Sequence, residues 1–283
     1  MSTIAERLKS ATEILTENGV ADARRQAASL LVLALRKDRT FLIAHSDYEL
    51  SAAEENRFRE FLERRARGEP FQYIAGRQEF YGLDFALTPD VLIPRSETEL
   101  LVETAIEILR EKSAPQFCEV GVGSGCISVS ILHALRAARA VGLDISENAL
   151  RVAVGNAERN NVAGRLKLEI SNVFEILGGE RFDLIVSNPP YISAEDFKDL
   201  QREVRDFEPS LALTDGEDGL TIIEKIVGDA PKFLKPDSFL LLEIGFGQAS
   251  RVRAMFAPRV WKNVEILPDL QNIPRVVKAR ICG

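Results

Sequence analysis

The chain has 283 residues, of which 46% are hydrophobic and 28% charged, and a formal net charge of −7. At about 150 residues per domain, this length predicts about two domains of ordinary globular composition. No apolar run reaches the roughly 18 residues of a membrane-spanning helix, and the first residues lack the charged-then-apolar order of a secretion signal. We therefore expect a cytoplasmic protein that does not bind membranes.

Cysteine and histidine are too scarce to suggest a metal or disulfide protein. The three cysteines, Cys118, Cys126 and Cys282, form no C-x-x-C pair, so neither a zinc site nor a disulfide framework is predicted. Cys118 and Cys126 are interpreted as small core residues, and His45 and His133 as packing or surface residues. The acidic net charge argues against a protein that holds nucleic acid mainly through its phosphates.

The charge divides the chain into two parts. Residues 1–80 contain 13 basic and 13 acidic residues, so the whole negative excess lies in residues 81–283. The first part is predicted to be helical, with helices starting at the capping residues Thr3 with Glu6, Asp22, and Ser51 with Glu54. We predict a helical domain over 1–77, a hairpin linker over 78–90 and an α/β domain over 91–283.

The second part alternates helices with short apolar strands. A helix capped by Ser96 and Glu99 is predicted first. The predicted strands are Phe117–Gly121, Ala140–Leu143, Leu166–Ile170, Phe182–Ser187, Phe239–Ile244 and Val260–Ile266. Such alternation predicts a parallel sheet with helices on both faces.

A glycine loop follows the first strand of that sheet. Gly121-Val122-Gly123-Ser124-Gly125 has the spacing G-x-G-x-G, not the G-x-G-x-x-G that binds a pyrophosphate. Glu119 would repel a pyrophosphate but could attract the cationic amino and sulfonium groups of S-adenosylmethionine, so we favour this methyl donor over NAD. Alternatively, the loop is a tight strand-to-helix turn that binds nothing.

Asp144 ends the next strand, where a carboxylate can accept hydrogen bonds from ribose hydroxyls. It could instead cap the helix that follows.

The strand 182–187 leads into Asn188-Pro189-Pro190-Tyr191, at the edge where open α/β sheets bind ligands. The prolines lack N–H groups, so the turn presents the Asn188 side-chain oxygen and the Pro189 carbonyl as acceptors for a planar –NH2 group. Tyr191 could lie against the flat face of that group. Such acceptors would stabilise the positive charge that develops on a nitrogen as it is methylated. The alternative is a proline-rich turn that only closes a strand.

With these residues assembled, the chain resembles the protein-(glutamine-N5) methyltransferases of peptide chain release factors, the PrmC/HemK family. Asn-Pro-Pro-Tyr is shared with DNA adenine methyltransferases and indicates the reaction type, whereas the flanking segments indicate the family. They include residues 68–76, 80–85, Leu92-Ile93-Pro94-Arg95-Ser96-Glu97-Thr98-Glu99, Asp144-Ile145-Ser146 and Phe207-Glu208-Pro209-Ser210-Leu211-Ala212-Leu213.

The resemblance implies a Rossmann-like S-adenosylmethionine-dependent methyltransferase domain and a small N-terminal helical domain that helps to dock the release factor. The substrate would be the glutamine of the Gly-Gly-Gln loop of class-1 release factors, methylated on its side-chain amide nitrogen. The residues implied to hold the donor are Gly121 to Gly125, Asp144, Val173 and Asn188, and those implied to hold the glutamine are Asn188, Pro189, Pro190 and Tyr191. We expect a monomer that does not bind nucleic acid directly.

Three positions depart from the family pattern. Glu119 stands where Asp is commoner, Ser96 replaces a proline, and Asn172 replaces an acid that would contact the adenine amine. Asn172 can still accept a hydrogen bond through its side-chain oxygen. Arg95 and Glu97 are interpreted either as part of the site or as a solvated, salt-bridging loop.

Two other functions remain open at this point. The same turn suits amino-methylation of a nucleic-acid base, although the chain lacks a basic, aromatic-rich insert. A non-catalytic adaptor could bind a translation protein through its helical part and a nucleoside through its α/β part.

Overall fold

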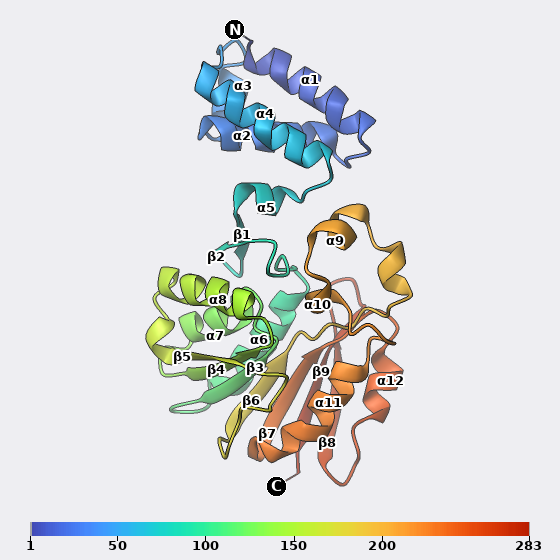
Figure 1. Ribbon diagram of the computed structural model, residues 1–283. Helices are drawn as coiled ribbons and strands as arrows, with labels where there is room; N and C mark the ends of the chain where they lie inside the picture. Colours follow the sequence, from blue (N-terminus) through green and yellow to red (C-terminus); the bar gives the residue numbers. More distant parts are fainter. Residues whose placement is uncertain (1, 283) are drawn as a thin grey trace. The chain divides into compact units, whose positions relative to one another are not determined.

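The computed structural model describes residues 2–282, and these divide into two units (Figure 1). One unit comprises residues 2–76 and 201–207, and the other comprises 77–200 and 208–282. The segment 201–207 therefore joins the helical unit although it is distant in sequence. Along the described chain, no helix is long and apolar enough to cross a membrane.

The first unit is built from helices around its own apolar core. Their bounds are α1 Ile4–Glu17, α2 Ala23–Leu35, α3 Arg39–Ala44, α4 Ala52–Ala66, α5 Phe71–Ala75 and α9 Arg202–Phe207. The capping boxes predicted at Thr3 and Ser51 are confirmed. Asp22 occupies the predicted N-cap position of α2, but its side chain makes no capping hydrogen bond, because its backbone is left-handed and its carboxylate pairs with Arg25 at 3.0 Å.

The second unit begins with a hairpin and contains a seven-stranded sheet. The hairpin strands are β1 Arg77–Phe80 and β2 Leu83–Ala86. The sheet strands are β3 Gln116–Val120, β4 Arg139–Asp144, β5 Leu166–Ile170, β6 Phe182–Ser187, β7 Leu234–Glu243, β8 Trp261–Pro268 and β9 Pro274–Ile281. Their order is β5-β4-β3-β6-β7-β9-β8, and only the pairs β7–β9 and β8–β9 are antiparallel. The predicted Rossmann-like α/β fold is confirmed, with β9 as a strand that we did not predict.

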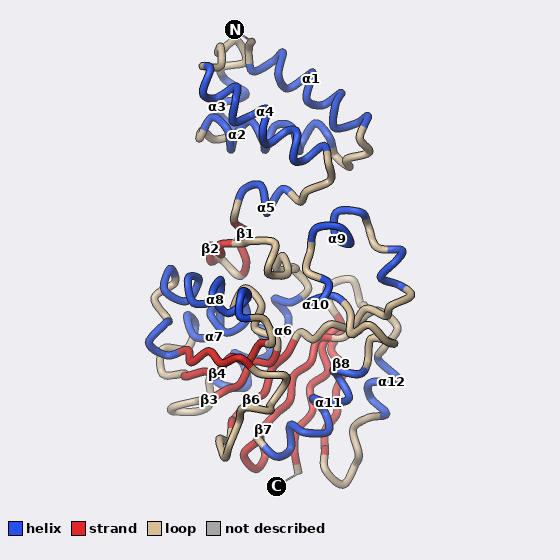
Figure 2. Tube along the Cα trace, in the orientation of Figure 1, coloured by secondary structure: helices blue, strands red, loops and turns tan. Residues whose placement is uncertain are grey.

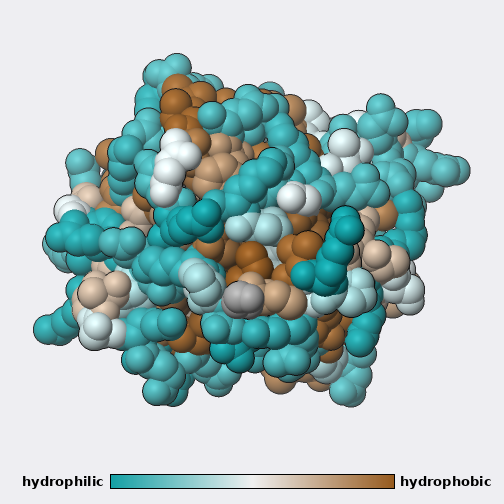
Figure 3. Space-filling view, turned by 90° about the horizontal axis from the view of Figure 1, so that it is seen from below, coloured by the Kyte–Doolittle hydropathy of each residue, from teal (hydrophilic) through white to brown (hydrophobic). Residues whose placement is uncertain are grey.

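Helices cover both faces of this sheet (Figure 2). Successive residues of β6 alternate: Leu184 and Val186 enter the core under one set of helices, and Ile185 enters the core under the other. The helices are α6 Thr98–Leu109, α7 Cys126–Ala134, α8 Glu147–Arg159, α10 Ser210–Leu213, α11 Thr221–Asp229 and α12 Ala249–Ala254. The face in Figure 3 is mostly hydrophilic, with small hydrophobic areas between the polar residues.

The predicted Ser96 cap of α6 is wrong. The helix begins at Thr98, with Glu97 at its N-cap position, one residue later than a cap at Ser96 would require. The Ser96 hydroxyl donates to Glu97, and the Glu99 carboxylate accepts from the Tyr81 N–H at 3.0 Å. Both members of the expected capping box are thus engaged elsewhere, and Thr98 becomes a buried residue at the start of the helix.

Candidate functional site

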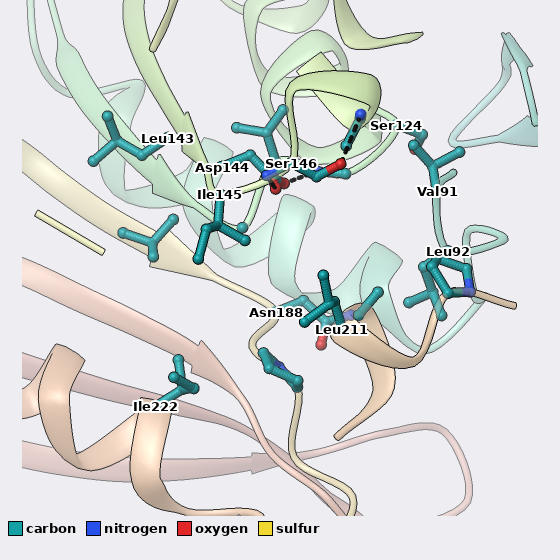
Figure 4. A pocket seen from close by; sticks show the side chains of 18 of the residues that line it. Val91, Leu92, Ser124, Leu143, Asp144, Ile145, Ser146, Asn188, Leu211 and Ile222 are labelled. Carbon is teal, nitrogen blue, oxygen red and sulfur yellow. Dashed lines mark hydrogen bonds between the residues drawn. The ribbon is translucent and has the colours of Figure 1, made fainter. Parts of the chain in front are cut away.

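A cavity of about 290 Å³ lies where the parallel strands end (Figure 4). The loops after β3, β4, β5 and β6 all contribute to its wall, as expected for the carboxyl edge of an open α/β sheet. Its mainly apolar lining carries a few polar groups, which is typical of a small-molecule site. The residues that line it include Arg95, Thr98, Gly121, Val122, Gly123, Ser124, Cys126, Leu143, Asp144, Ile145, Asn172, Val173, Asn188, Pro190 and Ile222.

The glycine loop forms the turn between β3 and α7. Gly121, Gly123 and Gly125 all have positive φ, which side chains with a Cβ adopt only with strain. A Cβ at Gly125 would lie 3.2 Å from the Cβ of Ala153, so α7 starts in close contact with α8. The loop therefore exposes backbone to the cavity while its end is locked into helix packing.

Asp144 holds two segments of the cavity wall together. Its carboxylate accepts from the Gly123 N–H at 2.8 Å and from the Ser146 N–H at 2.9 Å. The cap of α8 is Ser146, which accepts from Ala149, so Asp144 is not the capping residue. Because a carboxylate has about four lone-pair positions, Asp144 can still accept from a ligand hydroxyl.

The loop after β5 places Asn172 and Val173 on the cavity. Val173 is buried with a φ of 58°, an unusual conformation for a β-branched residue, and its carbonyl accepts from the Ser171 hydroxyl at 2.9 Å. The Asn172 Nδ2 donates to Glu175, whereas no hydrogen bond to its side-chain oxygen is found within residues 2–282. Asn172 thus presents an acceptor at the position where an acid was expected.

Glu119 is fully buried beneath the glycine loop and does not line the cavity. One carboxyl oxygen accepts from the Ser128 N–H at 2.9 Å, and the other has no partner among the described residues. Burial raises the pKa of Glu119 to about 8, against the lowering effect of the Ser128 hydrogen bond. The structure therefore places a largely neutral carboxyl under α7, away from the position in which an ionised group would face a cationic donor.

The Asn-Pro-Pro-Tyr turn divides between cavity and core. Asn188 and Pro190 line the cavity, whereas Pro189 is buried. The Tyr191 hydroxyl donates to Glu243 at 3.2 Å, and the Tyr191 carbonyl accepts from Gln248 at 2.8 Å. Burial and the Glu243 carboxylate raise the pKa of the Tyr191 phenol. Tyr191 is thus held beneath the turn and is not among the lining residues.

Thr98 and Glu243 are the functional candidates that sequence reasoning missed. The Asn188 Nδ2 donates to the Thr98 hydroxyl at 3.2 Å, and that hydroxyl donates to Glu243 at 2.7 Å. The sequence did contain a signal for Glu243. A glutamate at the end of an apolar strand is costly to bury unless it has hydrogen-bond partners, so its position predicts that such partners lie nearby.

Arg95 is not part of a solvated loop. It lines the cavity and pairs at 2.5 Å with Glu208, whose side chain is almost fully buried and also accepts from the Ile93 N–H. The Glu97 carboxylate accepts from the neighbouring Ser96 hydroxyl at 3.1 Å, and Glu97 does not line the cavity. His45 and His133 are exposed and lie outside the cavity lining, and Cys118 is a core residue as predicted, whereas the buried Cys126 also touches the cavity.

Comparisons with known proteins agree with this geometry. Residues 6–76 match the family model "PrmC N-terminal domain", and residues 96–205 match "Methyltransferase small domain". A release factor glutamine methyltransferase of Geobacter sulfurreducens is 45% identical over 94% of this chain and 93% of its own length. One of Koribacter versatilis is 38% identical over 98% of each chain. The crystal structure of a methyltransferase from Pyrococcus furiosus shares the fold, with a TM-score of 0.52 at 16% identity over 81% of this chain and 99% of that one.

These relatives span nearly the whole chain, and their identity is high enough to establish kinship. The resemblance drawn from the sequence motifs is thereby confirmed. The chain belongs to the release factor glutamine methyltransferase family.

Proposed function

We propose that this protein transfers a methyl group from S-adenosylmethionine to the side-chain amide nitrogen of the glutamine in the Gly-Gly-Gln loop of class-1 peptide chain release factors. The observation that carries the proposal is the position of Asn188. Its amide nitrogen is engaged by Thr98, so its oxygen remains as an acceptor beside the glycine loop. The names of the relatives support the same substrate.

The cavity fits the proposed methyl donor. The backbone of residues 121–124 faces the cavity, whereas Gly125 is not a lining residue. Asp144 and Asn172 present acceptors for ribose hydroxyls and an adenine amine. Apolar walls are provided by Leu143, Ile145 and Ile222. The bound donor would supply an electrophilic methyl carbon on a cationic sulfur. Glu119 contributes from below by holding the first turn of α7 in place, not by direct charge attraction.

Asn188, which lines the cavity, would recognise the substrate amide together with the backbone carbonyl of Pro189, a buried residue that lies between the lining residues Asn188 and Pro190. Their oxygens accept from the two hydrogens of the glutamine –NH2 group and so orient its nitrogen. An amide nitrogen is a poor nucleophile because its lone pair is delocalised into the carbonyl. As that nitrogen forms a bond to the methyl carbon and becomes positive, both acceptors bind its hydrogens more strongly, which lowers the barrier. The bond between this carbon and the donor sulfur would break, S-adenosylhomocysteine would leave with the electron pair, and the nitrogen would release one of its two hydrogens as a proton to give the neutral methylamide. Pro190 shapes the turn, and Tyr191 supports it from beneath.

The two units would have different roles. The helical unit would help to dock the release factor, and the α/β unit would carry out the transfer. We place the protein in the cytoplasm, where release factors act, and propose a monomer without direct nucleic-acid contacts.

The test is to incubate the purified protein with S-adenosylmethionine and a release factor, followed by mass spectrometry of the Gly-Gly-Gln peptide. We expect one added methyl group on the glutamine. A release factor with that glutamine replaced by glutamate is the matched control and should stay unmodified. An unmodified peptide despite active donor, or labelled methyl on nucleic acid in place of protein, would refute the proposal.

A further inference from the structure

A buried chain of hydrogen bonds runs from Asn188 into the protein. The Asn188 Nδ2 donates to Thr98 Oγ1 at 3.2 Å, Thr98 Oγ1 donates to Glu243 Oε2 at 2.7 Å, and the Tyr191 hydroxyl donates to Glu243 Oε1 at 3.2 Å. Thr98 is 2% exposed and Glu243 is 1% exposed. The chain links the start of α6, the turn after β6 and the end of β7, so three separate elements meet behind the site.

When Glu243 is ionised, its carboxylate sets the direction of this chain. A carboxylate only accepts, so the single hydroxyl hydrogen of Thr98 is committed to Glu243. The Thr98 oxygen can then only accept from Asn188, and the group that faces Thr98 must be the Asn188 –NH2. The Asn188 oxygen is consequently turned toward the cavity.

We propose that Thr98 and Glu243 are positioning residues that hold the Asn188 side-chain amide in the orientation required for methyl transfer. This inference rests on the proposed function, because the orientation matters only if the substrate presents an –NH2 group. With the Asn188 amide flipped, two –NH2 groups would face each other, and the acceptor that stabilises the transition state would be lost. The pair acts through Asn188 and contacts no reacting atom.

The charge state of Glu243 follows from its neighbours. Burial is the largest effect and raises the pKa of Glu243, and the nearby Glu97 acts in the same direction. The ionised form is favoured by the hydrogen bonds from Thr98 and Tyr191 and by the charge of Arg275 in β9, but the net effect is a raised pKa. Glu243 in turn contributes to the raised pKa of the Cys126 thiol at the start of α7, so this thiol lies within electrostatic range of the carboxyl group. Once protonated, Glu243 could donate to Thr98, which could then donate to the Asn188 oxygen and permit the flipped amide. Turnover should therefore fall on the acid side as Glu243 takes up a proton.

The decisive comparison is between Thr98→Val and Thr98→Ser, with glutamine methylation as the readout. We expect Thr98→Val to lower kcat about 10- to 100-fold, the usual loss when a group that orients a functional residue is removed, with little change in KM for the donor. Thr98→Ser keeps the hydroxyl and should recover most of that loss. Thr104→Val removes another buried hydroxyl from α6, one that donates to the Leu100 carbonyl, and should leave kcat unchanged.

Two further measurements keep the inference testable if Thr98→Val is unstable. Glu243→Gln should remove the acid-side fall from the pH profile of kcat, because no ionised carboxylate remains to be protonated. The side-chain amide signal of Asn188 in a ¹H–¹⁵N NMR spectrum, identified by its absence in Asn188→Ala, should shift in both variants without any substrate present.

The outcomes separate this inference from the function on which it rests. If the unmodified protein fails to methylate release factor glutamine, the proposed function is refuted. If the unmodified protein does methylate glutamine but Thr98→Val has an unchanged kcat, the positioning role is overturned. It is also overturned if Glu243→Gln keeps both the acid-side fall in kcat and the original position of the Asn188 side-chain amide signal.

Discussion

Two buried glutamates differ in how their carboxyl groups are satisfied. Both oxygens of Glu243 accept a hydrogen bond from a side-chain hydroxyl. Glu119 has one backbone donor for one oxygen and none for the other within the described chain. A buried carboxyl with few donors favours its neutral form, so the two glutamates are expected to respond to pH and substitution in different ways.

Glu119→Gln should reveal the cost of ionising Glu119. The folded-state pKa of about 8 lies above the ordinary value of 4.5, so the contribution of the neutral carboxyl is complete below pH 4.5 and is lost as the pH rises through about 8. The free energy of unfolding of the unmodified protein should therefore fall relative to Glu119→Gln across this window. We expect a relative change of about 1 to 4 kcal/mol, since a tenfold change in proton affinity corresponds to about 1.4 kcal/mol.

Urea unfolding of both proteins between pH 5 and pH 8.5 measures this difference. Glu107→Gln, at an exposed position of α6, controls for the removal of one carboxylate. A difference between Glu119→Gln and the unmodified protein that does not vary with pH would contradict the expectation.

Asn188→Ala should abolish most turnover. The substitution removes the side-chain oxygen that would accept from the substrate –NH2 group, and loss of one such transition-state contact typically costs about 100- to 1,000-fold in kcat. Affinity for the release factor should change only a few-fold, because the helical unit is untouched. Transfer of labelled methyl and a separate binding titration measure the two effects. Full activity in this variant would rule out the proposed chemistry.

At the scale of elements, the turn after β6 depends on a close backbone approach from the loop before α11. A Cβ at Gly219 would lie 2.3 Å from the Tyr191 carbonyl oxygen, and Gly219 has a φ of 77°. Gly216 has a similar φ of 79°, but a Cβ there would meet no atom within 4 Å. Substitution of Gly216 would therefore introduce backbone strain alone, whereas substitution of Gly219 would introduce the same strain together with a steric clash.

Gly216→Ala should cost about 1 to 2 kcal/mol of unfolding free energy, the price of a left-handed alanine. Gly219→Ala should cost more and should also lower kcat, because the Tyr191 carbonyl and the turn that holds Asn188 must move. Chemical unfolding and methylation assays on both variants test this. Equal effects on stability and activity would show that the contact with Tyr191 is unimportant.

At the scale of the whole molecule, the helical unit is completed by a segment from far along the chain. Arg65, whose side chain is 6% exposed, donates at 2.7 Å to Glu203 of α9 and also to the Glu69 carbonyl. The Phe207 ring lies close to Gly68. The unit therefore depends on residues 201–207 as well as on residues 2–76.

Arg65→Ala should loosen α9. The substitution leaves Glu203 without its partner, so trypsin should cleave after Arg202 and Arg205 several-fold faster under native conditions, in proportion to the population of the opened segment. Arg7→Ala removes a pair with Glu55 from the surface of the same unit and is the control. Mass spectrometry of the early fragments measures the rate of cleavage after Arg202 and Arg205. Unchanged rates at these two sites would show that the Arg65–Glu203 contact does not hold α9 in place.

Much of the fold and part of the site could be predicted from local patterns. Leu166–Ile170 and Phe182–Ser187 were predicted with their observed bounds, because apolar runs between turns are a local signal. The strand β9 was missed. The side-chain caps expected at Asp22 and Ser96 do not form, because each side chain pairs with a residue nearby in sequence instead, Asp22 with Arg25 and Ser96 with Glu97.

The sequence by itself determined the order of glycine loop, acid and Asn-Pro-Pro-Tyr turn, and with it the fold class and the family, since these depend on residue types at fixed spacing. Only the tertiary structure decided that Glu119 is buried away from the cavity, that Tyr191 supports the turn from beneath, and that Thr98 and Glu243 meet behind Asn188. The physical reason is that burial and hydrogen-bond partners arise from packing between elements: Thr98 and Glu243 are 145 positions apart in the chain.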